Sequence, residues 1–122
     1  GRGRRGGFWG ALLMATRTPT GFETVCKLGS GFSDEDLATL KQRLDPIQRT
    51  GPPAGLKWKL EPDAWFEPEL VLELLGAEIS QSPIHTCGGG YAVRFPRYKR
   101  QRDDKTPETA TESDEVIALY KI

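Results

Sequence analysis

Apolar residues occur in short runs along the chain, and glycine or proline separates most of these runs. Residues 7–17 are largely apolar and end at the turn sequence Thr18-Pro19-Thr20-Gly21; this length and these flanks favour a buried strand over a helix. Residues 22–28 alternate between the two faces of a second strand. One face holds Phe22, Thr24, Cys26 and Leu28, and the other holds Glu23, Val25 and Lys27. The two segments are expected to pair as an antiparallel hairpin.

Two helices are predicted, and each begins at a serine. Ser33 is expected to cap a helix whose first turn holds three acidic residues, which suit the positive end of the helix dipole. The apolar stripe of this helix consists of Leu37, Leu40 and Leu44. Pro46 limits its end. A short C-terminal helix over residues 113–120 is expected to be capped by Ser113.

Proline and glycine limit the strands in the second half of the chain. Residues 46–62 are rich in both and are expected to form a flexible loop. Residues 70–79 are ambiguous, because their leucine and glutamate residues favour a helix by propensity. A last strand begins at residues 91–94. Pro96 cannot donate to a ladder, so the strand must bulge or run along an edge there, and the bulge is expected to turn Phe95 outward.

The composition restricts the class of protein. A chain of 122 residues with 14 glycines and 9 prolines suits one small domain of short strands and turns. No apolar run approaches the roughly 20 residues of a membrane helix, so no membrane partner is expected. Cys26 and Cys87 are too few for a disulfide framework, and His85 with Cys87 supplies only two ligands, so no metal site is predicted. An intracellular location follows, cytoplasmic in a prokaryote and nuclear or organellar in a eukaryote.

Charge is unevenly distributed, although the formal net charge is zero. Residues 94–105, which we call the cationic segment, hold six basic and two acidic side chains, and six minus two leaves a local excess of +4. A guanidinium group pairs with two phosphate oxygens at once, so phosphate is the expected partner. Phe95 and Tyr98 lie inside the segment, as aromatic residues do on nucleic-acid-binding surfaces. A solvated charged strand is the simpler interpretation of the same run.

Five segments, taken in order, resemble motifs of the ATP-dependent DNA ligases. Residues 1–7 resemble the glycine- and arginine-rich turn that follows the last nucleotide-contacting lysine motif of that family, and the cationic segment resembles its C-terminal motif. The three segments between them are similar to the family's intervening blocks and comprise residues 25–35, 63–68 and 76–83. The resemblance covers nearly the whole chain.

The resemblance implies a mainly β fold. Residues 1–122 would form a single OB-fold domain, a Greek-key β-barrel with one internal helix and a C-terminal helical tail over residues 106–122. The first strand of the barrel would precede Gly1, so the barrel is expected to lack it. In this fold residues 70–79 form a strand, and Gly76 is a bulge or a bend of the barrel.

The resemblance also implies roles for individual residues. The family's active-site Lys-x-Asp-Gly, whose lysine takes up AMP, is absent, so no catalytic residue is assigned and the isolated chain is expected to be inactive. Arg102, Asp104 and Lys105 match the residues that engage the β- and γ-phosphates of ATP. Arg94 and Phe95 match the dipeptide at the nick, where an apolar wedge widens the groove. The candidates for DNA contact are Arg2, Arg4, Arg5, Lys27, Arg94, Phe95, Arg97 and Arg100.

The implied function is to bind nicked duplex DNA and to orient the ATP phosphates in an enzyme that seals 3′-OH/5′-phosphate nicks. ATP and Mg²⁺ are the expected cofactors of the full enzyme, with none bound by this domain alone. The expected partners are nicked DNA and the nucleotidyltransferase domain, and the domain is expected to be monomeric. Two alternatives remain open: a stand-alone OB-fold protein that binds single strands, and the related domain of an mRNA-capping nucleotidyltransferase.

Overall fold

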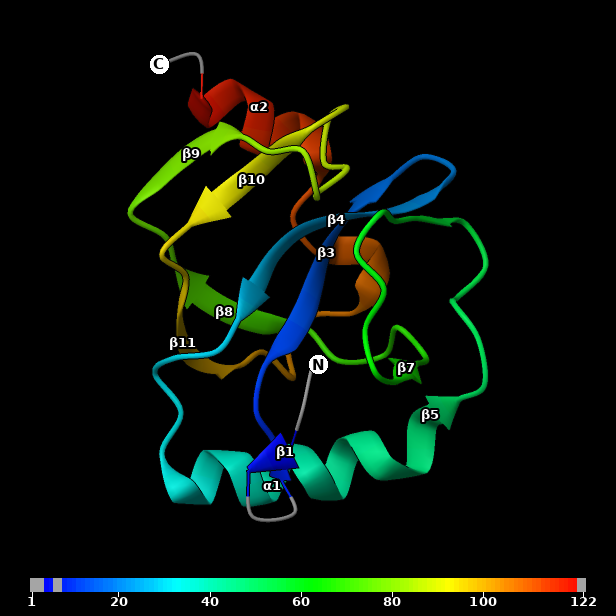
Figure 1. Ribbon diagram of the computed structural model, residues 1–122, viewed down its shortest axis with the longest axis vertical. Coiled ribbons are helices and arrows are strands. Elements are labelled where there is room, and N and C mark those ends of the chain that lie inside the picture. The colour runs from blue at the N-terminus through cyan, green and yellow to red at the C-terminus, as the bar shows by residue number, and fades with distance from the viewer. Residues whose placement is uncertain (1–3, 6–7, 121–122) are drawn as a thin grey trace.

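The computed structural model describes residues 4–5 and 8–120, with side chains from Gly10 onward. In chain order the strands are β1 (Arg4–Arg5), β2 (Phe8–Trp9), β3 (Leu12–Thr18), β4 (Gly21–Leu28), β5 (Gln48–Arg49), β6 (Leu56–Lys57), β7 (Trp65–Phe66), β8 (Leu72–Leu75), β9 (Glu78–Gln81), β10 (Tyr91–Arg94) and β11 (Arg97–Gln101). The α-helices are α1 (Asp34–Leu44) and α2 (Ser113–Tyr120), and 3-10 turns span Asp45–Ile47 and Pro107–Thr109. Figure 1 shows α1 and α2 at opposite ends of the β structure.

β3 and β4 form the predicted antiparallel hairpin, whose ladder runs from the pair Leu12–Leu28 to the pair Thr18–Gly21 with one bulge after Met14. Both faces of β4 are covered over most of its length, since Glu23 and Val25 are buried on one face and Thr24, Cys26 and Leu28 on the other. The segment around Cys87 covers the second face: Gly88 donates its backbone N–H to the Glu23 carboxylate at 2.8 Å. β4 is therefore a central strand, between β3 and β6.

The prediction that Ser33 caps α1 is confirmed, and Asp36 completes a reciprocal capping box. The Ser33 hydroxyl accepts the backbone N–H of Asp36 at 3.1 Å, and the Asp36 carboxylate accepts the backbone N–H of Ser33 at 2.9 Å. The three leucines of the predicted stripe are buried. Two of them, Leu40 and Leu44, pack in one core cluster with Leu12 of β3, so the helix closes one end of the barrel.

Residues 70–79 form strands, as the fold resemblance implied and against their helical propensity. β8 pairs with β11, and β9 pairs with β10, both antiparallel. Gly76 lies at the break between β8 and β9. A Cβ atom at this position would lie 2.2 Å from Cγ1 of Val93, so a larger residue at the bend would have to displace the Val93 side chain.

Two short strands lie within residues 46–62, the predicted loop. β5 pairs with β7, and β6 runs parallel to β4. Phe22 also donates its backbone N–H to the carbonyl oxygen of Gly55 at 3.0 Å. Backbone hydrogen bonds therefore attach this segment to the rest of the fold at two places.

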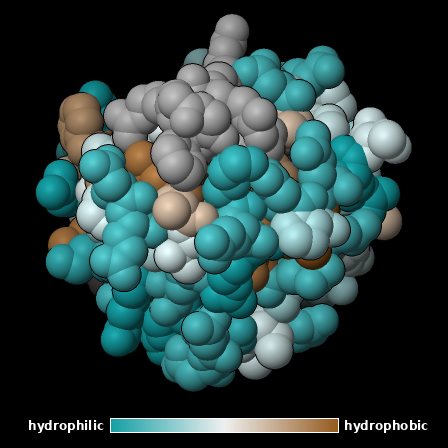
Figure 2. Space-filling model, turned by 90° about the horizontal axis from the view of Figure 1, so that it is seen from below, coloured by the Kyte–Doolittle hydropathy of each residue, from teal (hydrophilic) through white to brown (hydrophobic). Residues whose placement is uncertain are grey.

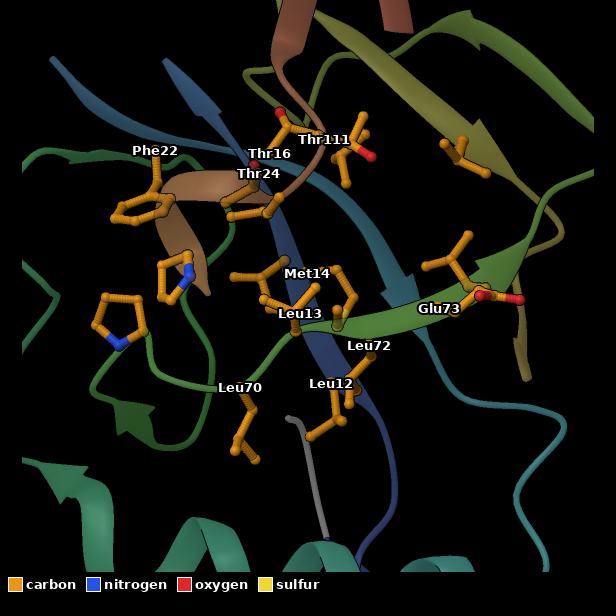
Figure 3. Close-up of a pocket in the computed structure, with 18 of the residues that line it drawn as sticks. Leu12, Leu13, Met14, Thr16, Phe22, Thr24, Leu70, Leu72, Glu73 and Thr111 are labelled. Atoms are coloured by element: carbon orange, nitrogen blue, oxygen red, sulfur yellow. The ribbon is translucent and has the colours of Figure 1, made fainter. Parts of the chain in front are cut away.

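The hydrogen-bonded ladders of the described residues do not close into a continuous barrel. Among the described strands, β3 pairs only with β4, apart from one bridge between Arg17 and Glu112, and β8 pairs only with β11. Both strands line an open cavity of about 880 Å³. Figure 3 shows apolar side chains of β3 and β8, among them Leu12 and Leu72, on the walls of this cavity.

The prediction that Ser113 caps α2 is wrong, because Ser113 is the first residue of the helix and its side chain is buried. Its hydroxyl oxygen lies 2.8 Å from that of Thr16 in β3. The backbone N–H of Glu112 donates instead to the Glu115 carboxylate at 3.1 Å. Arg17 also donates through Nε to the carbonyl oxygen of Ala110 at 2.7 Å, so polar contacts from β3 hold the start of the tail.

The surface around α1 is polar. Figure 2 shows hydrophilic residues over most of the face seen from that end, with small separate apolar spots. No helix in the described part of the chain is long and apolar enough to cross a membrane.

Candidate functional site

The register of β8 and β11 brings the last arginines of the cationic segment to a carboxylate. A bulge between Tyr98 and Arg100 shifts the ladder by one residue, so Arg100 rather than Lys99 faces Glu73. Arg102 follows two positions later. Its backbone N–H donates to the carbonyl oxygen of Val71 at 2.8 Å, which extends the pairing of the two strands by one hydrogen bond. Residues two apart share a face of a strand, so both guanidinium groups reach Glu73.

Two carboxylates hold the guanidinium group of Arg102. Its Nε and Nη2 donate to the two oxygens of Asp104 at 2.9 and 2.8 Å, in a bidentate pair. Its Nη1 donates to Oε1 of Glu73 at 2.9 Å, and Nε of Arg100 donates to the same oxygen at 3.1 Å. The Arg102 side chain is 25% exposed, so one part of it still meets solvent. Lys105 follows on a turn in which its backbone N–H donates to the carbonyl oxygen of Arg102 at 3.2 Å.

These contacts shift the pKa values of all three groups and keep them charged. The hydrogen bond from Arg102 holds the pKa of the Asp104 carboxyl well below its usual range, and the charge of Lys105 acts in the same direction. Hydrogen bonds from Arg100 and then Arg102 lower the pKa of Glu73. The two carboxylates, Asp104 first, raise the pKa of Arg102. The cluster is therefore a fixed array of charges near neutral pH.

A residue of α1 holds the turn after β11. Nη1 of Arg43 donates to the Asp103 carboxylate at 2.7 Å and also to the side-chain amide oxygen of Gln101. Asp103 and Asp104 are adjacent, but they bind guanidinium groups from different elements. The turn that carries Asp104 and Lys105 is thus tied to both the sheet and the helix.

Phe95 projects from the connection between β10 and β11, as Pro96 predicted. Its backbone φ is +54°, a left-handed conformation that is strained for a phenylalanine, and the residue is 69% exposed. The guanidinium carbon of Arg94 lies 4.9 Å from the centre of the ring. Nη1 of Arg94 also lies 3.1 Å from Oε1 of Glu78, its partner on β9. The dipeptide therefore presents an aromatic ring and a paired arginine on the surface.

The structure places the remaining DNA-contact candidates at several different locations. Lys27 at the end of β4 and Arg97 at the start of β11 are exposed. Arg4 and Arg5 form β1, of which the backbone is described, and Arg2 lies outside the described residues. Arg94 belongs to the β9–β10 pair, whereas Arg100 and Arg102 belong to the β8–β11 region (Figure 1). The predicted ATP-phosphate residues are thus grouped together, and Arg94 with Phe95 forms a second location.

The Gly29–Gly31 turn has a structural role. Gly31 has a φ of +93°, and a Cβ atom there would lie 2.6 Å from the carbonyl oxygen of Tyr98. The neighbouring Ser30 carbonyl accepts the backbone N–H of Tyr98 at 2.8 Å. Because the turn packs directly on the backbone of β11, it supports the strand that carries the candidate arginines.

The two cysteines are buried and free. Burial raises the pKa of Cys26 to about 12, so its thiol stays protonated. The described residues contain no group of three histidine, cysteine, aspartate or glutamate side chains arranged to hold a metal ion.

Comparison with known proteins identifies the family. The family model described as "ATP dependent DNA ligase C terminal region" matches residues 5–105. The chain belongs to this family. A DNA ligase of Ignicoccus hospitalis is 52% identical over 99% of the chain, and one of Hyperthermus butylicus is 49% identical over the same share. This ligase C-terminal region spans 22% and 21% of the two relatives, or about a fifth of their length.

A solved structure shares the fold of this ligase region. A mycobacterial DNA ligase D complexed with ATP and MES superposes with a TM-score of 0.66 over 89% of the chain and 35% of that protein, at 25% identity. The fold expected from the resemblance is confirmed: it is the ligase OB fold, in which the described residues form mostly strands, two α-helices and sheets that do not close.

Sequence reasoning missed two residues of the site, Glu73 and Arg43. Glu73 is 29 positions from Arg102 in sequence and Arg43 is 60 from Asp103. The only sign of Glu73 in the sequence was its position as an acidic residue in the middle of an apolar run. The same pattern is expected of a strand residue that simply faces solvent. The β8–β11 register was needed to find it.

Proposed function

We propose that this ligase C-terminal region orients the phosphates of ATP for self-adenylylation and contacts nicked duplex DNA, in a full-length enzyme that seals 3′-OH/5′-phosphate nicks. The observation that carries the proposal is the fixed Arg102 guanidinium, paired with Asp104 and followed at once by Lys105. These are the three residues that match the family's ATP-phosphate motif. The nucleotidyltransferase domain of the same enzyme would supply the lysine that takes up AMP.

Self-adenylylation needs positive charge beside the β- and γ-phosphates of ATP. When the lysine attacks the α-phosphate of ATP, the bond to the β-phosphate breaks and pyrophosphate leaves with additional negative charge. Cations held against that leaving group stabilise the transition state without reorganising. All three nitrogens of the Arg102 guanidinium donate to carboxylates, but the side chain remains 25% exposed, and Lys105 is exposed. Both can therefore face a pyrophosphate brought by a neighbouring domain.

Magnesium is expected to accompany ATP in the full enzyme. The carboxylates of this site do not fit a magnesium site, because Glu73 and Asp104 are both engaged by guanidinium groups. The residues of this region would act on the phosphates directly.

Contact with DNA would use a different part of the surface. Phe95 presents an exposed ring on a backbone that the preceding and following strands hold in place, which suits insertion into a groove. Lys27 and Arg97 would contact backbone phosphates. Arg94 would first have to share its guanidinium between Glu78 and a phosphate.

The DNA contact can be tested through the salt dependence of binding. The host for this test is a full-length ligase that carries the chain, such as the Ignicoccus hospitalis relative with its matching region exchanged for residues 1–122; we call it the host ligase. Replacing Arg97 by alanine should reduce the slope of log K against log salt by about 0.9, the value for one phosphate contact. Binding of nicked duplex is measured by fluorescence anisotropy between about 50 and 200 mM salt.

Lys41→Ala is the matched control for Arg97→Ala. Lys41 lies on α1, pairs with Asp45 just after that helix and is not among the DNA-contact candidates, so its loss should leave the slope unchanged. If the Arg97 variant showed the same slope as the unmodified host ligase, Arg97 would not contact a DNA phosphate.

A further inference from the structure

Glu73 is the one described side chain of the sheet that binds both a predicted DNA-contact arginine and the predicted ATP-phosphate arginine. Its Oε1 accepts Nε of Arg100 at 3.1 Å and Nη1 of Arg102 at 2.9 Å. It projects from the middle of β8, and Figure 3 shows it on that strand at the edge of the cavity. Nothing in the motif resemblance includes it.

The two carboxylates that hold Arg102 differ in how firmly they are placed. Asp104 lies two residues after Arg102, on the turn that follows β11, and its side chain is 64% exposed. Glu73 lies on a paired strand, and its side chain is 34% exposed. Of the carboxylates described around Arg102, only Glu73 connects the guanidinium to the sheet.

The β-bulge makes this connection possible. Without the register shift after Tyr98, Lys99 would face Glu73 and the arginines would lie one position further along. With the shift, Arg100 and Arg102 lie on the same side of β11 and meet one carboxylate oxygen between them. Bulges re-aim side chains in this way.

We propose that Glu73 is a positioning residue for self-adenylylation: it fixes the direction of the Arg102 guanidinium, and through Arg100 it links the nucleotide-facing and DNA-facing arginines. This inference rests on the proposed function of Arg102. A cation that stabilises a leaving group must be oriented before the reaction. Glu73 supplies that orientation without touching the nucleotide, because its carboxylate is occupied by the two arginines.

The test uses Glu73→Gln in the host ligase, a substitution that keeps the shape and removes the charge. The rate of self-adenylylation at saturating ATP should fall by about 10–100-fold, the loss usual for residues that orient the ligands of a metal site without touching the metal. Sealing of a nick that already carries AMP should change by less than threefold. Glu73→Asp, which keeps the charge but is one methylene shorter, should give an intermediate rate.

A double-mutant cycle distinguishes positioning from a structural role. In a host ligase that already carries Arg102→Ala, Glu73→Gln should cause no further loss of self-adenylylation, because there is no guanidinium left to orient. A structural role predicts the same loss in both backgrounds, and that outcome would overturn the proposal. Glu67→Gln, which removes a comparable ion pair with Arg49 at 2.5 Å, is the matched control and should leave both steps unchanged.

The outcomes also separate this inference from the proposed function. If Arg102→Ala slows self-adenylylation and Glu73→Gln does not, the positioning role is wrong and the function of Arg102 stands. If Arg102→Ala has no effect, the proposed function fails, and the Glu73 proposal fails with it. Thermal unfolding of each variant, with midpoints within a few degrees of the unmodified protein, shows that the fold is retained.

Discussion

Replacing Arg102 by alanine in the host ligase is expected to slow self-adenylylation by about 100–1000-fold, the loss usual for one preorganised transition-state contact. Lys105→Ala should act in the same direction. In the proposed function both cations would face the pyrophosphate, which leaves only in the first step of the reaction. Sealing of a pre-adenylylated nick involves no pyrophosphate, so it should change little. The two rates are measured separately, with labelled ATP for the first and a nick carrying AMP for the second.

The comparison between the two steps also decides between the functions considered. If both rates fell equally, Arg102 and Lys105 would serve general binding of DNA. If neither changed, the ion pairs of Arg102 would form only a surface network, of a kind usually worth about 0–1 kcal/mol. A stand-alone protein that binds single strands has no pyrophosphate to stabilise, so a selective loss in the first step would exclude that alternative.

Phe95→Ala is expected to weaken nick sealing by about 10–100-fold, since contact between an aromatic side chain and a base is worth about 1–3 kcal/mol. Self-adenylylation should stay nearly unchanged, because in the proposed function the ring would contact DNA and not ATP. The measurement is the rate of sealing of a pre-adenylylated nick by the host ligase. Trp58→Ala is a suitable control, because Trp58 is also an exposed aromatic residue but lies in the loop before β7.

The stability of the Phe95 variant tests the same interpretation independently. A buried phenylalanine contributes about 3–5 kcal/mol, and its loss would lower the unfolding midpoint of the chain by more than about 10 °C. The Phe95 residue is 69% exposed, so the midpoint should move by only a few degrees. A large fall would show that the ring packs against the fold in solution and does not serve as a wedge.

Local chemistry made several parts of this fold predictable from the sequence. The Ser33 capping motif depends on residues only three apart, and the turn between β3 and β4 depends on its own proline and glycine. The outward position of Phe95 followed from Pro96, which cannot join a ladder. In each case the residues that decide the structure are neighbours in sequence. The motif resemblance then resolved residues 70–79, where propensity favoured the wrong element.

Features that depend on register or on distant packing were not predictable. Ser113 has the sequence context of a helix cap. In the structure it is the first residue of α2, and its side chain is buried against Thr16 of β3. The position of Glu73 opposite Arg100 depends on one bulged residue in β11, and a register shift by one residue changes every cross-strand pair. The pairing of Arg43 with Asp103 likewise needed the packing of α1 against the end of β11.

Several side chains that line the open cavity between β3 and β8, among them Met14 and Leu72, are only partly buried in the folded chain. Unfolding therefore adds less new apolar surface to solvent than it would for a closed barrel, and apolar surface is what raises the heat capacity of the unfolded state. A well-packed domain of 122 residues would gain about 1.5–1.8 kcal/mol/K on unfolding, at about 12–15 cal/mol/K per residue. For the isolated chain, calorimetry should give a smaller value, so its free energy of unfolding should follow a flatter curve with temperature.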